Sequence, residues 1–215
     1  MDFGNKKTFL AFPPITNTYL ILSLSCSILV TSKILKSEFF NIHYRLIVYY
    51  HQVYRFISPT IFFGKLGFKS CMMLYMFIRF SKTLEASHFE FRQADYLYSL
   101  IITNVLTALF KLHARSKKNL SASLVGFSIF MWGRKNSQKL LHLVGLIHLK
   151  GKYVTFLFFG ISFFFKQRTL KLEIMGAACA AIFDFLTERC PRINGGQDLI
   201  RTPKVFRLFF KTSKI

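Results

Sequence analysis

Acidic residues are scarce in this chain of 215 residues. Nine Asp and Glu stand against 30 Lys and Arg, which gives a formal net charge of +21 at pH 7. Charged residues together reach only 18%, whereas an average soluble domain holds about a quarter. These shortages exclude an acidic protein and a disordered polar chain. The four cysteines are too irregularly spaced for a disulfide scaffold or a zinc site, so we expect no metal and no cofactor.

Apolar residues are abundant instead. They make up 52% of the chain, and 27 positions are phenylalanine. A soluble nucleic-acid-binding protein would account for the positive charge, but it would not carry uninterrupted apolar runs such as the one around Phe164 and Phe165. Basic residues beside long apolar segments are typical of a protein embedded in a bilayer. We therefore expect contact with membrane lipids and no specific nucleic-acid partner.

Six apolar segments organise the sequence. They cover residues 8–32, 56–78, 96–110, 119–133, 153–165 and 174–183, and only the second contains charged residues, Lys65 and Lys69. The runs lack the polar face that a helix in a soluble bundle would present, so the alternative of a soluble bundle is disfavoured. The sequence predicts an all-α integral membrane protein, a bundle of six transmembrane helices.

Several segments are short for a full crossing of the membrane. About 30 Å of hydrocarbon requires about 20 helical residues, and the later segments offer roughly 15 or fewer. Either Lys and Arg at the helix ends lengthen the span by snorkelling, or the surrounding bilayer is thin.

The distribution of basic residues predicts the orientation. Lys and Arg are more numerous on the side that holds both termini, which we therefore place in the cytosol. The predicted organisation is a cytosolic N-terminal segment at 1–17, a six-span membrane domain at 18–188 and a basic cytosolic tail at 189–215. Within the tail, residues 199–215 alternate basic with apolar side chains, which indicates an amphipathic helix on an anionic membrane surface.

Two pairs of charges lie in or beside the apolar segments. Lys65 and Lys69 are four residues apart and would share one helix face, either lining a polar groove or lying at the membrane interface. Asp184 and Glu188 would share a face at the end of the sixth segment, where an interfacial position is favoured.

Five groups of short motifs follow one another around the apolar segments. They are Pro13-Pro14-Ile15-Thr16; Gln52, Tyr54 and Arg55 with Phe62, Phe63, Gly64, Gly67 and Phe68; Leu84, Glu85, Phe89, Ala94 and Asp95; Trp132, Gly133, Arg134, Lys135 and Asn136; and Gly195, Gly196, Thr202 and Pro203. In this order and spacing the chain resembles the derlins, rhomboid-related pseudoproteases of the endoplasmic reticulum, from Phe12 to Phe210.

The resemblance implies a rhomboid-like bundle without catalytic activity, in the endoplasmic reticulum membrane. Misfolded proteins would enter a lateral opening between the second and fifth spans and cross a locally thinned membrane for degradation. The implied partners are a ubiquitin ligase complex, a cytosolic AAA ATPase and further derlin copies or relatives as a homo- or hetero-oligomer. An alternative location is a membrane surrounding a complex plastid, where related proteins serve protein import.

The resemblance also assigns motif residues, with two departures. The loop motif before the second span is Gln52, Tyr54 and Arg55, and Tyr54 replaces the tryptophan of the family; Phe63, Gly64 and Gly67 form the motif of that span. The small-residue motif of the sixth span is Gly176 with Ala180, where the family has a second glycine. Alanine still permits close approach of two helices.

Two other functions compete with this interpretation. An active rhomboid protease needs a serine on the fourth span and a histidine base on the sixth. Ser121 lies at the expected place of the serine, but all six histidines precede residue 149 and Glu173 occupies the place of the base. A transporter would pair its intramembrane charges and carry inverted repeats, and we find neither pattern. We therefore predict no catalytic residues.

Overall fold

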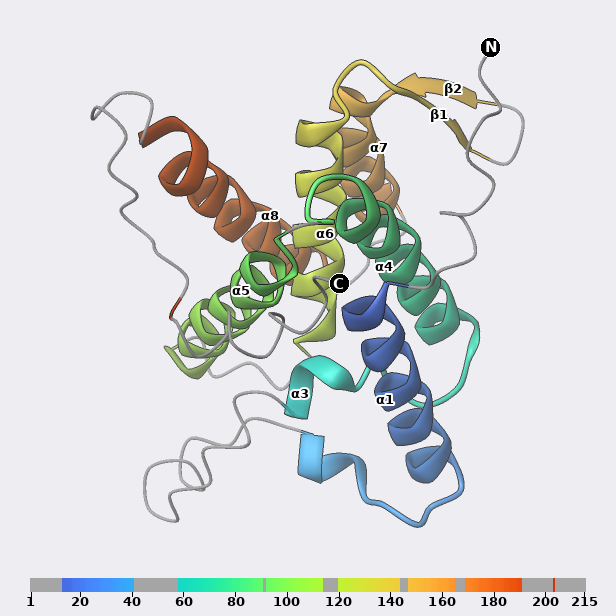
Figure 1. Cartoon of the computed structure of the whole chain (residues 1–215). Helices are drawn as coiled ribbons and strands as arrows, with labels where there is room; N and C mark the ends of the chain where they lie inside the picture. The colour runs from blue at the N-terminus through green and yellow to red at the C-terminus, as the bar shows by residue number, and fades with distance from the viewer. Residues whose placement is uncertain are drawn as a thin grey trace.

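The computed structural model describes residues 13–40, 58–90, 92–113, 120–143, 147–164, 169–190 and Pro203. Its helices are α1 (Pro14–Thr31), α3 (Ser58–Ile61), α4 (Phe68–Ser87), α5 (Gln93–His113), α6 (Ser121–Lys135), α7 (Gly151–Phe164) and α8 (Leu170–Asp184). A 3₁₀ turn, η1 (Ser37–Phe40), follows α1, and a π-helical turn, η3 (Phe185–Arg189), continues α8. Figure 1 shows the helices as one bundle.

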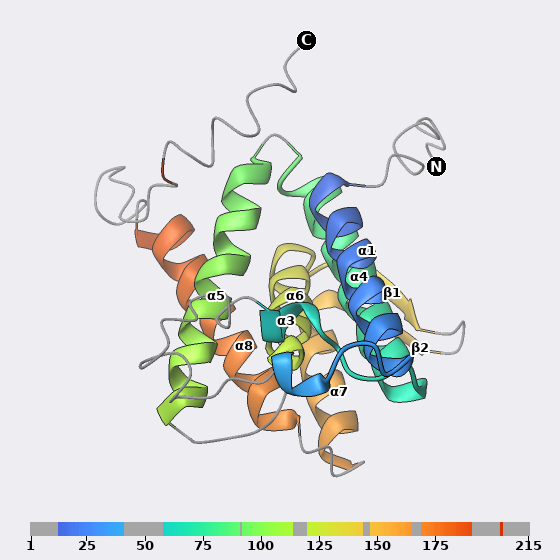
Figure 2. The ribbon, with the colours of Figure 1, turned by 90° about the horizontal axis from the view of Figure 1, so that it is seen from below.

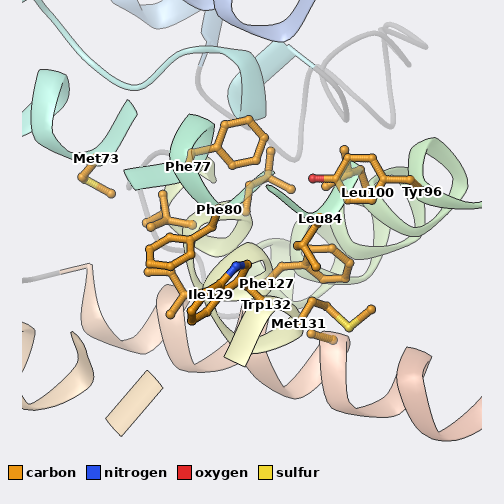
Figure 3. Close-up of a cluster of buried hydrophobic side chains, with 14 of the residues drawn as sticks. Met73, Phe77, Phe80, Leu84, Tyr96, Leu100, Phe127, Ile129, Met131 and Trp132 are labelled. Atoms are coloured by element: carbon orange, nitrogen blue, oxygen red, sulfur yellow. The ribbon is translucent and has the colours of Figure 1, made fainter. Parts of the chain in front are cut away.

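Helix α6 lies at the centre of the bundle. Figure 2 shows it surrounded by the other long helices, and 12 of its 15 residues are buried. Apolar or small residues occupy every side of this helix, so it has no polar face to expose to water. This pattern is typical of a buried helix. Figure 3 shows its side chains Ile129 and Trp132 beside Phe80 of α4, within one buried apolar cluster.

The outer helices expose large apolar side chains. Phe156 and Phe163 of α7 are 73% and 74% exposed, and Ile21 of α1 and Phe110 of α5 are more than half exposed. Soluble proteins rarely leave so much apolar surface uncovered. An outward-facing apolar surface around a packed centre fits lipid as the surrounding solvent.

The six long helices run alternately up and down the bundle. The start of α1 meets the end of α4, and Ser81 near that end bonds Tyr96 at the start of α5. The end of α6 lies beside the start of α7 and the end of α8, through Gly133 with Gly151 and Arg134 with Asp184. One end of the bundle, which we call the charged pole, therefore gathers residues 13–16, 81–90, 92–96, 132–136 and 184–188. This is the arrangement that six successive crossings require.

The prediction of a helical membrane protein holds at this coarser level. Among the described residues, α1 is the helix that is both long and apolar enough for a crossing by itself, and α7 is apolar but shorter. Six membrane-crossing helices therefore stay a prediction.

Three details differ from the sequence-based expectations. The segment 56–78 is not one helix, because α3 ends at Ile61 and α4 begins only at Phe68. Helix α1 begins at Pro14, inside the segment assigned to 1–17. An antiparallel hairpin of β1 (Leu140–Leu143) and β2 (Ile147–Lys150) connects α6 to α7 and was not predicted.

Candidate functional site

The start of α1 is held by a carboxylate from α4. Pro13 and Pro14 have no backbone N–H, so the donors left in the first turn belong to Ile15 and Thr16. Glu85 accepts both, at 2.9 Å from Ile15 N and 2.8 Å from Thr16 N, and also accepts the Thr16 hydroxyl at 2.7 Å. Glu85 is 1% exposed. The Pro-Pro-Ile-Thr motif and the Leu-Glu motif thus form a single junction between the two helices.

Hydroxyl groups extend this junction to α5. Thr16 Oγ1 lies 2.8 Å from Ser81 Oγ, and the Ser81 and Tyr96 hydroxyls share a hydrogen bond of 2.6 Å. The Tyr96 ring packs against Phe89 with centroids 5.2 Å apart. Because polar groups buried in an apolar bundle are costly unless paired, this chain of contacts fixes α1, α4 and α5 in one arrangement.

In the motif at the end of α6, some residues pack against neighbouring helices and others form ion pairs. Trp132 packs against Phe80, with ring centroids 5.3 Å apart. A methyl group on Gly133 would lie 2.8 Å from the Gly151 carbonyl oxygen, so glycine lets α6 and α7 approach closely. The Asn136 side chain donates to the Trp132 carbonyl at 3.2 Å and closes the helix end.

The two basic residues of that motif pair with the end of α8. Arg134 Nε and Lys135 Nζ each lie 2.9 Å from a carboxylate oxygen of Asp184, and Lys135 also pairs with Glu188. Asp184 and Glu188 do share one side of the chain as predicted. The Asp184 side chain is 5% exposed and held in an ion pair, and its expected interfacial position stays a prediction.

The segment before α4 turns at a glycine between two anchored rings. Phe62 stacks on Phe40 with centroids 4.7 Å apart, while Phe63 packs against Phe77 at 5.8 Å. Gly64 follows with φ +125°, a conformation that other residues rarely adopt. Gly67 then adopts an extended conformation immediately before α4.

This turn corrects the shared helix face that was predicted for Lys65 and Lys69. Lys65 lies in the non-helical turn and Lys69 in the first helical turn of α4, so they do not share a helix face. Both are exposed. The prediction that Lys65 and Lys69 share a helix face depended on an unbroken helix over 56–78.

Sequence comparison supplies the family. Residues 12–204 match the Der1-like family, which is nearly the whole chain. The chain belongs to the Der1-like family.

Named relatives are derlins of plants and yeast. A Derlin-1 of Oryza sativa subsp. japonica is 25% identical over 194 residues, which cover 90% of this chain and 79% of that protein. Derlin-2.1 of Zea mays is 22% identical over 213 residues, with coverage of 94% and 85%. An uncharacterized derlin-like protein of Schizosaccharomyces pombe is 28% identical over 151 residues, with coverage of 70% and 67%. These matches support a membrane protein with a role related to degradation at the endoplasmic reticulum.

At the opposite pole of this Der1-like bundle, Ser121 begins α6 and is 1% exposed. It borders a cavity of about 270 Å³ that is lined by Phe63, Lys69, Ser70, Met73, Ser121, Ala122 and Thr169. Glu173, at the place of the protease base, does not line this cavity. Its carboxylate instead accepts the Thr169 hydroxyl at 2.8 Å. One oxygen of the Glu173 carboxylate is thus bonded to Thr169, and the other, Oε2, is buried with no hydrogen-bond partner in the described part of the chain.

A buried lysine, Lys111, lies near the end of α5 at the same pole. The structure buries it to 2% exposure, and its ammonium has no hydrogen-bond partner among the described residues.

The small-residue motif of α8 faces the central helix of the Der1-like bundle. A methyl group on Gly176 would lie 1.8 Å from the Ser123 carbonyl oxygen, and Ala180 is fully buried. On the facing helix, a methyl on Gly126 would lie 2.0 Å from the Glu173 carbonyl oxygen. Each helix thus offers a glycine to the backbone of the other, and α6 with α8 forms the most extensive helix contact in the bundle.

The loop motif Gln52, Tyr54 and Arg55 lies outside the described residues. So do Gly195, Gly196 and Thr202, and most of the predicted tail at 189–215. Their assignments stay predictions.

Proposed function

We propose that this Der1-like protein is a non-catalytic membrane factor that binds misfolded proteins and assists their retrotranslocation for degradation. The observation that carries the proposal is the family match across residues 12–204. The endoplasmic reticulum membrane is the proposed location, with both termini in the cytosol. A ubiquitin ligase complex and a cytosolic AAA ATPase are the proposed partners on that side.

The proposed route for clients lies between α4 and α7, the second and fifth spans. Each of these helices packs against α6, whereas their described residues scarcely pack against each other (Figure 2). Two helices that both pack against α6 but scarcely against each other are a suitable place for an apolar client segment to enter laterally.

The absence of catalysis is proposed from chemistry. A serine hydroxyl needs a neighbouring base to become a nucleophile at neutral pH. No histidine follows residue 149, and Glu173 is bonded to Thr169. A protease function would have to use Ser121 without a histidine on the sixth span.

The test uses the full chain in cells that lack it. A misfolded membrane reporter should be degraded more slowly without the chain, and site-specific crosslinkers on α4 and α7 should capture that reporter intact. Reporter fragments that disappear with Ser121→Ala would instead establish a protease. Colocalisation with a plastid-surrounding membrane, together with impaired protein import on depletion, would favour the import alternative.

A further inference from the structure

A deep groove runs between α7 and α8 with α6 as its floor. Its volume is about 780 Å³, within the range of cavities that hold whole small molecules. It differs from the proposed client route, because it lies on the α8 side of α7 rather than on the side of α4.

The groove changes from charged to apolar along its length. At the charged pole it is bordered by Arg134, Lys135, Lys152, Asp184, Glu188 and Arg189. Farther along, the walls are Phe156 and Phe159 of α7 and Ile174, Ala177, Ala178 and Ala181 of α8. Both walls change in the same direction, since Lys152 begins α7 and Asp184 ends α8. An occupant must therefore have a polar end at the pole and an apolar end in the bundle.

The charges at the polar end leave an excess of positive charge. Asp184 is bonded by Arg134 and Lys135, and Glu188 by Lys135. Lys152 and Arg189 have no carboxylate partner within the described part of the chain, and Arg134 uses only Nε toward Asp184. Four basic groups thus face two carboxylates, both already paired. The polar end of the occupant should be an anion.

We propose that this groove binds an anionic phospholipid. The phosphate and its acidic headgroup would lie against Lys152, Arg189 and the free side of Arg134, and an acyl chain would lie between the α7 phenylalanines and the α8 alanines. A lipid satisfies both ends at once, since a basic rim at the membrane boundary attracts acidic headgroups. Arginine also suits phosphate through paired N–H donors. The proposal does not rest on the client-binding function.

The test is photolabelling of the full chain in nanodiscs. Two lipids carry the same photoreactive acyl chain, one with a phosphatidylserine and one with a phosphatidylcholine headgroup. Peptide mapping should place the phosphatidylserine label on α7 and α8 in excess over the phosphatidylcholine label. Each of Lys152→Gln and Arg189→Gln should reduce the phosphatidylserine label about fivefold, the effect of about one basic residue at a membrane surface. Lys139→Gln, exposed and outside the groove, should change nothing.

Two variants that enlarge a side chain distinguish binding in the groove from general attraction to the bilayer surface. Ala181→Phe fills the groove and should remove the label from α7 and α8. Ile182→Phe enlarges an exposed neighbour that does not line the groove, and should leave the label in place. Fluorescence of the single tryptophan, Trp132, verifies that the variants are folded. Equal labelling by the two lipids, labelling unchanged by Ala181→Phe, or capture of a client segment there in place of lipid would overturn the proposal.

Discussion

At the scale of single residues, the clearest case is a carboxylate used as a helix cap from another helix. Glu85 receives three hydrogen bonds from the first turn of α1, two of them from backbone N–H groups. The two prolines before Ile15 remove the other donors of that turn. In an apolar surrounding each unpaired backbone donor is costly, so one acid and two prolines together complete the helix end.

Replacing Glu85 by alanine should destabilise the protein strongly. Two buried N–H groups and the Thr16 hydroxyl would lose their acceptor, at about 1–3 kcal/mol for each group. Glu85→Gln keeps one acceptor oxygen and should therefore lose less stability than Glu85→Ala. Thermal unfolding in detergent micelles, followed by the fluorescence of Trp132, measures both. Glu90→Ala, an exposed change in the following loop, is the control, and equal midpoints for Glu85→Ala and this control would contradict the role of the cap.

Ser121 provides a second prediction at this scale. Because its cavity holds no described base beyond the exposed Lys69, Ser121→Ala should leave client degradation unchanged. Purified protein should also leave model transmembrane substrates intact in both forms. Substrate cleavage by the natural chain that the variant lacks would show that Ser121 is a nucleophile.

At the scale of elements, two glycines set the distance between the central helix and α8. Gly126 and Gly176 each lie against the backbone of the opposite helix, at a position where any side chain would overlap that backbone. Close backbone approach is the usual means by which helices associate in a membrane, where burial of apolar side chains gives no advantage over lipid. The contact also fixes Asp184, two turns further along α8, beside Arg134.

Gly176→Ala should therefore destabilise the bundle, although alanine is the better helix former. The added methyl would lie 1.8 Å from the Ser123 carbonyl oxygen, and the two helices would have to separate to remove this overlap. Overpacking of this kind costs about 1–3 kcal/mol of stability. Gly160→Ala is the matched control on α7, because nothing lies within 4 Å of its added methyl. The control should be neutral or stabilising by up to about 1 kcal/mol. Unfolding midpoints that shift alike for the two variants would contradict the packing argument.

The sequence predicted the positions of most helices and not the pairings between them. Charge-free runs located α1, α5, α6, α7 and α8, because in lipid the apolar length of a helix is its main requirement. The break before α4 was missed, since Gly64 and Gly67 lie in a run whose hydropathy is that of a helix. The contacts of Glu85 with Thr16 and of Arg134 with Asp184 join residues about 50 or more apart in the chain. No local pattern carries such information.

At the scale of the whole molecule, the helices differ in length in a way that the apolar windows did not reveal. Helix α5 has 21 residues and spans about 31 Å, because polar residues at both ends continue the helix beyond the charge-free window. Helices α6 and α7 have 15 and 14 residues, about 22 and 21 Å. Helix α8 has 15 residues, but η3 continues it to Arg189. Among the described helices, the mismatch with a bilayer of about 30 Å is therefore largest for α6 and α7. Helix α7 is one side of the proposed client route.

We predict that the membrane is thinned beside α7. A deficit of roughly 8 Å, at fractions of a kcal/mol per Å, would cost a few kcal/mol per helix unless the lipid compresses or basic ends snorkel. Inserting four leucines after Gly160, where an added methyl would have nothing within 4 Å, lengthens α7 by about 6 Å. The same insertion in α6 would move Gly126 away from α8.

The lengthened protein should insert normally, restore bilayer thickness beside α7 and slow the movement of clients. Cryo-electron microscopy in nanodiscs measures the thickness around each form. In a bilayer of short-chain lipids both forms should move clients equally, because that bilayer is thin without the protein. A flat bilayer around the natural chain would instead mean that Lys152 and the other basic residues at the helix ends extend to the headgroups. Clients would then cross a membrane of full thickness, and the short helices would serve only the close packing of α6 with α8.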